Sequence, residues 1–323
     1  MEVKTGMNKK RSFGQFVSNF SMPILLLLLV TVFSILSDKF FTRLNLTNIL
    51  VQNVHIAICT SGVFIIMISG GCDLSIGYQM SVAAVLVAKL LSNGVVSVPV
   101  AILLGIAICV ALGFFNGVMS IVLNSQPMIV TLGTMAIFQG ISYLISGSKT
   151  YHNLPKSFMY LGQGRLFGVV PLNSLIALAV IVIVGVIVNR THIGRKIYAV
   201  GDNPEAAKLA GLNVAKIKIL VFTCAGILVG ISAILLAARS GSADSSTGTG
   251  IEFTGIIACV LSGVALKGGE GTLWKAIVAV FVLGVLSNGM QLINLGTYPQ
   301  FIAKGVIMLV SLYLSNRTAK KAA

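Results

Sequence analysis

Long apolar blocks separated by short polar segments run through the whole chain. Ile24–Val30 and Leu175–Val188 are two such blocks, and blocks of this kind are typical of helices that cross a membrane. The pattern predicts ten spans, near residues 20–36, 49–69, 73–91, 98–123, 127–145, 171–189, 217–238, 252–266, 274–293 and 299–315. The eighth is the weakest, and we expect a partial span buried by its neighbours, because broken helices survive at membrane depth only in such a setting.

The composition places the chain in the same class. Of its 323 residues, 56% are hydrophobic and 10% are charged, and the mean hydropathy is +0.97. A soluble domain carries about a quarter charged residues, so there is too little polar surface here for a soluble fold of this size. We therefore predict an all-α integral membrane protein with a single transmembrane domain over residues 1–323. Its polar parts would be cytoplasmic tails at 1–19 and 316–323 and an inner loop at 190–216.

The basic residues indicate an orientation in the membrane. The formal net charge is +15, but Lys and Arg lie in short clusters between apolar blocks, which is not the pattern of a nucleic-acid-binding surface. With ten spans, 15 of the 23 Lys and Arg residues fall on the side that holds both termini, and seven fall on the other side. Cytoplasmic loops are enriched in Lys and Arg, so both termini are predicted to be cytoplasmic.

A short sequence match indicates an internal repeat. Asn116 and Asn288 each lie eleven residues before a proline, within similar fragments 172 residues apart. An acidic residue opens the third span (Asp73) and another opens the eighth (Glu252). Five spans separate the two copies, so they would have opposite orientations. This is typical of inverted-repeat transporters, whose pathway lies between the two halves.

The inner loop after the sixth span carries the signals of one short helix. Asn203 suits the N-cap, Pro204 the first turn and Gly211 the C-terminal cap, which predicts a two-turn helix over Pro204–Ala210. A helix this short is not stable alone in water. It either folds back on its own bundle or the lipid interface, or it docks to a cytoplasmic partner, and physics alone leaves both open. The candidate docking residues are Asn203, Pro204, Glu205, Ala206, Ala207, Leu209 and Gly211.

Five polar residues near or within the spans are candidates for the translocation pathway or for gating: Asp73, Ser75, Asn116, Glu252 and Asn288. Gly70 and Gly71 break the helix before Asp73, which then either only caps the next helix or contacts substrate hydroxyls or moves during gating. Glu252 carries the same two alternatives. Asn116 and Asn288 either join helices to one another or contact substrate.

The sequence lacks the motifs of an enzyme. There is no GxxxxGK[ST] sequence, so the chain cannot bind ATP through a P-loop, and no HExxH, nucleophile elbow or dinucleotide fingerprint occurs. The five cysteines show no CxxC or Cys–His spacing. We predict no catalytic residue, no cofactor and no metal in this chain.

At these motifs the chain resembles the permease subunits of ribose-type ABC sugar importers. The resemblance covers most of the chain, from Phe40 to about Ser315, and rests on Ser69–Gly77, Ile197–Gly211 and Gly268–Gly271. One stretch departs from the pattern. Where such permeases read Glu-Leu-Asp-Ala-Ile-Ala-Ala, this chain reads Glu-Phe-Thr-Gly-Ile-Ile-Ala over residues 252–258, which puts a strict two-fold pathway in doubt.

The resemblance implies a permease of the bacterial cytoplasmic (inner) membrane that imports a small sugar by alternating access. It would pair with a second permease, identical or paralogous. Two cytoplasmic ATP-binding subunits would use the ATP, and an extracytoplasmic solute-binding protein would deliver the sugar. By this resemblance the short inner-loop helix is the coupling helix. Membrane lipid is expected as a further partner, and nucleic acid is not. A secondary active transporter without ATPase partners, and a membrane scaffold or sensor, are the alternatives.

Overall fold

A computed structural model describes the backbone of residues 5–322 and the side chains of residues 20–313. The described residues form thirteen helices and one two-stranded antiparallel hairpin, β1 (Arg165–Leu166) and β2 (Val170–Pro171). The helices are α1 (Thr5–Leu36), α2 (Arg43–Ile68), α3 (Ile76–Ser92), α4 (Val98–Val122), α5 (Pro127–Ser146), α6 (Lys156–Gln163), α7 (Leu172–Arg190), α8 (His192–Asp202), α9 (Pro204–Leu209), α10 (Val214–Ser240), α11 (Ile251–Leu261), α12 (Leu273–Leu292) and α13 (Thr297–Ala322).

The all-α membrane fold is confirmed at this level. Among the described residues, six helices are long and apolar enough to cross a membrane: α2, α4, α5, α7, α10 and α12. Each of the ten predicted spans coincides with one helix, but the number of helices that cross stays a prediction. The weak eighth span is α11, which has 11 residues, fewer than the roughly 20 that a full crossing needs.

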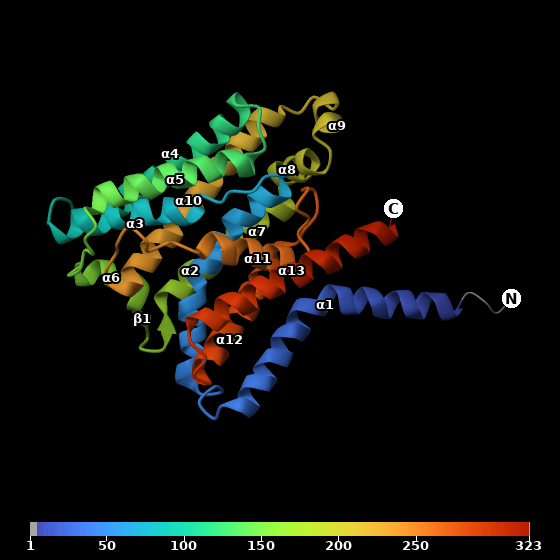
Figure 1. Cartoon of the computed structure of the whole chain (residues 1–323), viewed down its shortest axis with the longest axis horizontal. Helices are drawn as coiled ribbons and strands as arrows, with labels where there is room; N and C mark the ends of the chain where they lie inside the picture. Colours follow the sequence, from blue (N-terminus) through green and yellow to red (C-terminus); the bar gives the residue numbers. More distant parts are fainter. Residues whose placement is uncertain (1–4, 323) are drawn as a thin grey trace.

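Helices α2 and α10 form the centre of the bundle. They pack against each other; α10 also packs against α4, and α2 against α7, α11 and α12 (Figure 1). Small residues allow the closest of these approaches. A β-carbon at Gly113 on α4 would meet the Phe222 carbonyl oxygen of α10, and one at Gly226 on α10 would meet the Cys109 carbonyl oxygen of α4. Close backbone contact of this kind is a common way to join helices in lipid. Lipid chains are as apolar as the helix surfaces, so the hydrophobic effect does not drive the helices together there.

The helix boundaries repeat along the chain. Helices α2, α3, α4 and α5 begin 171, 175, 175 and 170 residues before α10, α11, α12 and α13. The packing repeats as well, because α3 packs on α4 and α5, as α11 packs on α12 and α13. These observations agree with the repeat that the Asn116 and Asn288 fragments predict, whereas its inverted orientation stays a prediction.

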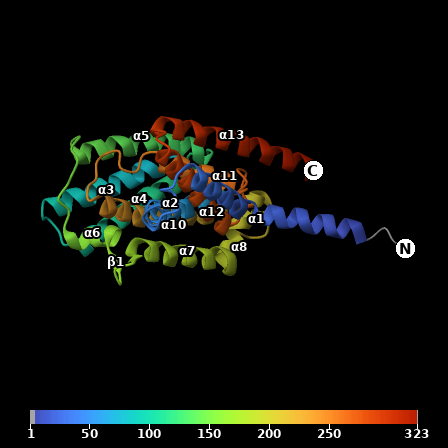
Figure 2. The same ribbon diagram turned by 90° about the horizontal axis from the view of Figure 1, so that it is seen from below.

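The ends of the chain lie on one side of the molecule together with α8 and α9 (Figures 1 and 2). The opposite side carries α6, the β1–β2 hairpin and the turn between α3 and α4. The predicted tails at 1–19 and 316–323 overlap the ends of α1 and α13, and their side chains lie outside the described residues. We call the side of α8 and α9 the inner face, following the predicted orientation.

Candidate functional site

Four polar side chains form a buried cluster where α3 begins against α4. Asp73 is 2% exposed. Its Oδ1 accepts hydrogen bonds from the Ser75 amide at 2.8 Å and the Ser75 hydroxyl at 2.6 Å. Its Oδ2 accepts from Gln79 Nε2 at 3.0 Å and Asn116 Nδ2 at 3.2 Å. We call Asp73, Ser75, Gln79 and Asn116 the Asp73 cluster; it joins the turn before α3 to the inner half of α4.

The cluster changes the role expected of Asp73. Ser75, not Asp73, occupies the N-cap position of α3, and Asp73 orders the turn in front of it. The α5 helix holds the same turn, because Thr131 Oγ1 accepts from the Leu74 amide and donates to the Cys72 carbonyl oxygen, both at 3.2 Å. Gln79 was not predicted as a site residue. Its position four residues after Ser75, on the same face of α3, is the signal that could have identified it.

A second copy of this turn lies between α10 and α11. The pattern Gly-x-x-Asp-x-Ser-x-Gly occurs at 70–77 and again at 241–248, 171 residues later. Asp244 Oδ1 accepts from the Ser246 amide at 2.7 Å and its hydroxyl at 2.9 Å, as Asp73 does with Ser75. Asp73 therefore has Asp244 as its counterpart in the repeat, and the sequence pairing of Asp73 with Glu252 was wrong.

Glu252 has a local role in the structure. It lies in the first turn of α11, it is buried, and both of its carboxylate oxygens accept from the Gly250 amide, at 3.2 and 3.0 Å. A carboxylate there also suits the positive end of the helix. Glu252 thus binds the amide of Gly250, the N-cap residue of α11, and it lies against Gly77 at the start of α3.

Asn288 is not part of the Asp73 cluster. It exchanges two hydrogen bonds with Asn45 of α2, each 2.9 Å long, and Asn45 also donates to the Phe40 carbonyl oxygen at 2.9 Å. The pair joins the first turn of α2 to the last turns of α12, at the end of the bundle away from α8. The two asparagines of the repeat therefore join different helices, and interhelical bonding is the role that both contacts favour.

We expect Asn45→Ala and Asn288→Ala to destabilise the bundle by less in combination than the sum of the single effects. Each single change leaves a buried amide without its partner, and interhelical hydrogen bonds in membrane proteins are worth about 0.6 kcal/mol on average. A double-mutant cycle in detergent unfolding measures the coupling. Asn53→Ala is the matched control, because the Asn53 amide donates within its own helix, to Ile49 at 2.7 Å. Additive effects at positions 45 and 288 would contradict the pairing.

The inner face carries the predicted short helix and a second helix in front of it. The Asn203 side chain accepts from the Ala206 amide at 3.0 Å, and Gly211 has a φ of +83°, so the predicted cap residues of α9 are confirmed in position. The preceding helix, α8, was not predicted. Ala207 is 5% exposed and packs on its own chain, whereas Leu209 is 89% exposed. Pro204, Glu205, Ala206 and Gly211 are exposed as well.

Three glycine-containing segments meet at the inner face: the end of α8, the turn after α2 and the loop between α11 and α12. Gly201, near the end of α8, lies against the Ile68 carbonyl oxygen at the end of α2 and against Gly269 in the loop between α11 and α12. The Gly269 amide donates to Ile68 at 2.9 Å. Gly70 follows with a φ of +80°, a conformation that favours glycine. We call the contact of Gly70, Gly201, Gly268 and Gly269 the glycine junction.

One side chain strengthens the link from α8 to the loop between α11 and α12. The Tyr198 hydroxyl donates to the Gly271 carbonyl oxygen at 2.9 Å. Burial raises the pKa of Tyr198, which keeps the phenol protonated as a donor at neutral pH. The glycine junction and this bond place α8 in direct contact with both copies of the repeat, through the end of α2 and the loop between α11 and α12.

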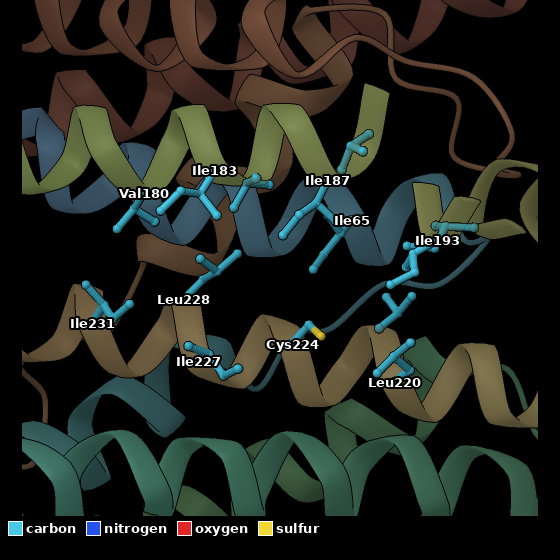
Figure 3. A pocket seen from close by; sticks show the side chains of 14 residues that line it. Ile65, Val180, Ile183, Ile187, Ile193, Leu220, Cys224, Ile227, Leu228 and Ile231 are labelled. Atoms are coloured by element: carbon cyan, nitrogen blue, oxygen red, sulfur yellow. The ribbon is translucent and has the colours of Figure 1, made fainter. Parts of the chain in front are cut away.

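An apolar cavity of about 280 Å³ lies between α7 and α10, beside α2 and α8 (Figure 3). Its lining consists of aliphatic side chains and one thiol, that of Cys224, with Ile187, Leu228 and Ile231 among the residues that Figure 3 labels. None of the lining residues carries a hydroxyl, an amide or a charge. This cavity therefore has the chemistry to hold apolar groups and not to bind a hydroxyl-rich solute.

Within the described residues, no group of three His, Cys, Asp or Glu side chains could hold a metal ion, and the five cysteines are free thiols. The Asp73 cluster, the Asn45–Asn288 pair and the glycine junction are thus the features that could serve function. They hold helices together at both ends of the bundle and link its inner face to α8 and α9.

Comparison with known proteins decides the class. Residues 45–312 match the family described as the branched-chain amino acid transport system permease component. The chain belongs to this permease family. It is a multi-pass protein of the bacterial cytoplasmic membrane, and the membrane permease component of an ABC import system.

Three curated relatives match over nearly their whole length. The ribose import permease protein RbsC of Bacillus subtilis (strain 168) is 31% identical over 90% of this chain and 91% of its own. The RbsC protein of Escherichia coli (strain K12) is 35% identical over 91% and 92%. The galactose/methyl galactoside import permease protein MglC of the same strain is 34% identical over 97% and 98%. No solved structure matches the chain.

Proposed function

We propose that this permease imports a small monosaccharide, with ribose-like sugars as the first candidates. The family description names branched-chain amino acids, but the relatives that align over almost the full chain are named for ribose and for galactose and methyl galactoside. A likeness that covers both ends of the chain supports the sugar class more strongly than the family description does. The Asp73 cluster and the Asn45–Asn288 pair leave the choice among monosaccharides open.

We further propose that two separate ATP-binding subunits drive this transport through α9, and that a second permease and an extracytoplasmic solute-binding protein complete the importer. The observation that carries this step is Leu209, an aliphatic side chain that is 89% exposed on a capped helix at the inner face. An exposed aliphatic side chain on a short, capped helix can serve as the anchor that fills an apolar pocket of a partner. Asn203, Pro204, Glu205, Ala206 and Gly211 would frame the contact, and Ala207 would hold α9 to its own chain.

Alternating access follows from the repeat as we interpret it. Ten spans in two inverted halves would place the pathway between α2–α5 and α10–α13. The constant shift of about 172 residues between the helix starts supports this arrangement. Asp73 lies three residues after Gly70 of the glycine junction, so we propose that Asp73, Ser75 and Asn116 act in gating. Glu252 and Asn288 would hold the second half.

We expect Leu209→Asp to abolish co-purification of an ATPase subunit with the tagged permease in mild detergent. The change places a charge in an apolar contact, and a central apolar anchor contributes about 2 kcal/mol or more to an interface. Phe167→Asp is the matched control, because Phe167 is 97% exposed at the tip of the hairpin on the opposite face, and it should leave the ATPase bound.

The alternative is a secondary carrier. If no ATPase co-purifies with the unmodified chain, and if the chain alone carries out uptake in proteoliposomes, the ATP-driven importer is excluded and the carrier takes its place. If Phe167→Asp releases the ATPase as fully as Leu209→Asp does, α9 is not the docking site.

A further inference from the structure

The segment between α10 and α11 enters the membrane layer without being helical. It begins on the outer side, where Ala243 forms a bridge with Tyr151 in the loop after α5. It ends deep in the bundle, where the Gly248 amide donates to the Ser81 hydroxyl at 2.9 Å. Ser81 lies five residues after the start of α3 and eleven before its end. Residues 243–250 therefore reach from the outer side to the inner half of α3, and we call Asp244–Gly250 the outer re-entrant segment.

Much of this segment is exposed in spite of its depth. The side chains of Ser246 and Thr249 are exposed, and Gly250 faces open space. The Thr249 hydroxyl makes no hydrogen bond within the described part of the chain. The buried side is well bonded, since the Ser142 hydroxyl of α5 donates to the Ser245 carbonyl oxygen at 3.0 Å. One face of the segment is thus fixed to the bundle while hydroxyl groups cover the other.

Lipid cannot cover such a face. In hydrocarbon, an unpaired hydroxyl group such as that of Thr249 costs several kcal/mol, and irregular backbone at membrane depth occurs only where protein buries it or where it lines a water-filled cavity. The Ser246 hydroxyl donates to Asp244 at 2.9 Å and keeps its oxygen free to accept. The α4 helix shows the lipid-facing alternative, because its exposed residues are apolar and include Leu103, Ala107 and Phe114. The outer re-entrant segment has the opposite chemistry.

We infer that the exposed hydroxyl face of the outer re-entrant segment lines the translocation pathway and forms hydrogen bonds with the hydroxyl groups of the passing solute. The inference rests on the proposed function for the class of solute, a small polyhydroxylated molecule. It differs from that function in assigning the contacts to the Ser246 and Thr249 hydroxyls, and not to the buried Asp73 cluster. The serine and threonine hydroxyls can donate to and accept from the hydroxyls of such a solute. Because they are neutral, they bind it weakly enough for it to move on.

Cysteine labelling tests the inference in membranes that contain the complete importer. Ser246→Cys and Thr249→Cys are made one at a time and exposed to a charged, membrane-impermeant methanethiosulfonate. Ala107→Cys, on the exposed apolar face of α4, is the lipid-facing control. The unmodified chain, in which Cys72 and Cys224 are half-buried, gives the background. Thiolates react and form only where water reaches them, so we expect both pathway cysteines to react at least about tenfold faster than the control.

A transport measurement completes the test. Thr249→Val keeps the shape of the side chain and removes its hydroxyl. It should reduce uptake of whichever sugar the wild type imports, among ribose, galactose, allose and arabinose, by about tenfold, while Thr249→Ser restores it. Ala107→Val should have no effect.

The outcomes separate the inference from the proposed function. If both cysteines react no faster than Ala107→Cys while the ATPase stays bound and uptake is normal, the segment is covered by protein, for example by the second permease, and the inference is wrong. The sugar importer then still stands. If the unmodified chain binds no ATPase and imports none of the four sugars, the proposed function fails whatever the labelling shows.

Discussion

Gly201→Ala should stop import while leaving the ATPase subunit attached. A β-carbon at position 201 would overlap the Ile68 carbonyl oxygen and lie 2.7 Å from the Gly269 amide nitrogen. Both are backbone atoms, so neither can swing aside as a side chain would. Overpacking of this kind costs about 1–3 kcal/mol, and the junction can relieve it only by moving α8 away from the end of α2 and from the loop between α11 and α12. The α9 helix lies beyond Asn203 and keeps its exposed surface, so docking survives while its effect on the bundle is lost.

Gly185→Ala is the matched control for this change. Gly185 is also within a helix, α7, and a β-carbon there would meet only the Leu273 side chain, at 3.8 Å. Both substitutions gain the same helix propensity, about 0.5–1 kcal/mol. The difference in uptake between the two variants therefore reports the effect of the glycine junction alone. Uptake by Gly201→Ala should fall at least about tenfold, equivalent to about 1.4 kcal/mol in the barrier, with the ATPase still co-purifying. Wild-type uptake by Gly201→Ala would show that the glycine junction does not transmit motion.

The sequence predicted the elements whose signals are local. Ten apolar blocks became ten helices, and the Asn203, Pro204 and Gly211 caps placed α9 within one residue of its observed end. Local signals were also overlooked. Ile193, Ile197 and Val200 recur at helical spacing after Thr191, whose side chain accepts from the Gly194 amide at 3.4 Å, and together they mark α8. The basic and polar residues between these positions make the apolar face of α8 short.

What the sequence could not provide is the set of partners. Asn116 lies 43 residues after Asp73, and Asn45 lies 243 residues before Asn288, so no local rule connects them. The pairing of Asp73 with Glu252 failed for a related reason. Both are acidic residues near the start of a short helix, but the repeat is carried by the turn in front of the helix, where Asp244 and Ser246 reproduce the hydrogen bonds of Asp73 and Ser75. The match is a short pattern, Gly-x-x-Asp-x-Ser-x-Gly, which a search for apolar periodicity does not detect.

Asp73→Ala should destabilise the protein far more than Asp244→Ala, although the two residues make the same turn. Removing the buried Asp73 carboxylate leaves the Ser75 amide and hydroxyl without their acceptor. It also removes one of the two acceptors of Gln79 and Asn116, which donate to the Ser75 hydroxyl oxygen as well, at 2.9 and 2.8 Å. Each unpaired buried donor costs about 1–3 kcal/mol, so we expect a loss of roughly 2–4 kcal/mol. Asp244 is half-exposed, so water can replace its oxygens, and the loss there should be about 0.5–1.5 kcal/mol. Denaturant or thermal unfolding in detergent compares the two.

A conservative variant, Asp73→Asn, separates a structural or gating role of Asp73 from direct contact with the sugar. If the carboxylate only orders the turn and moves with it during gating, the conservative Asp73→Asn will lower stability and the maximal rate of uptake together and leave the KM for the sugar unchanged. The asparagine side chain keeps one oxygen that can accept from Ser75. Its NH2 group replaces the oxygen to which Gln79 and Asn116 donate, so three donors would face one another. A raised KM with unaltered stability would instead mean that Asp73 contacts the sugar, which would require the cluster to open during transport and would place the pathway next to α4.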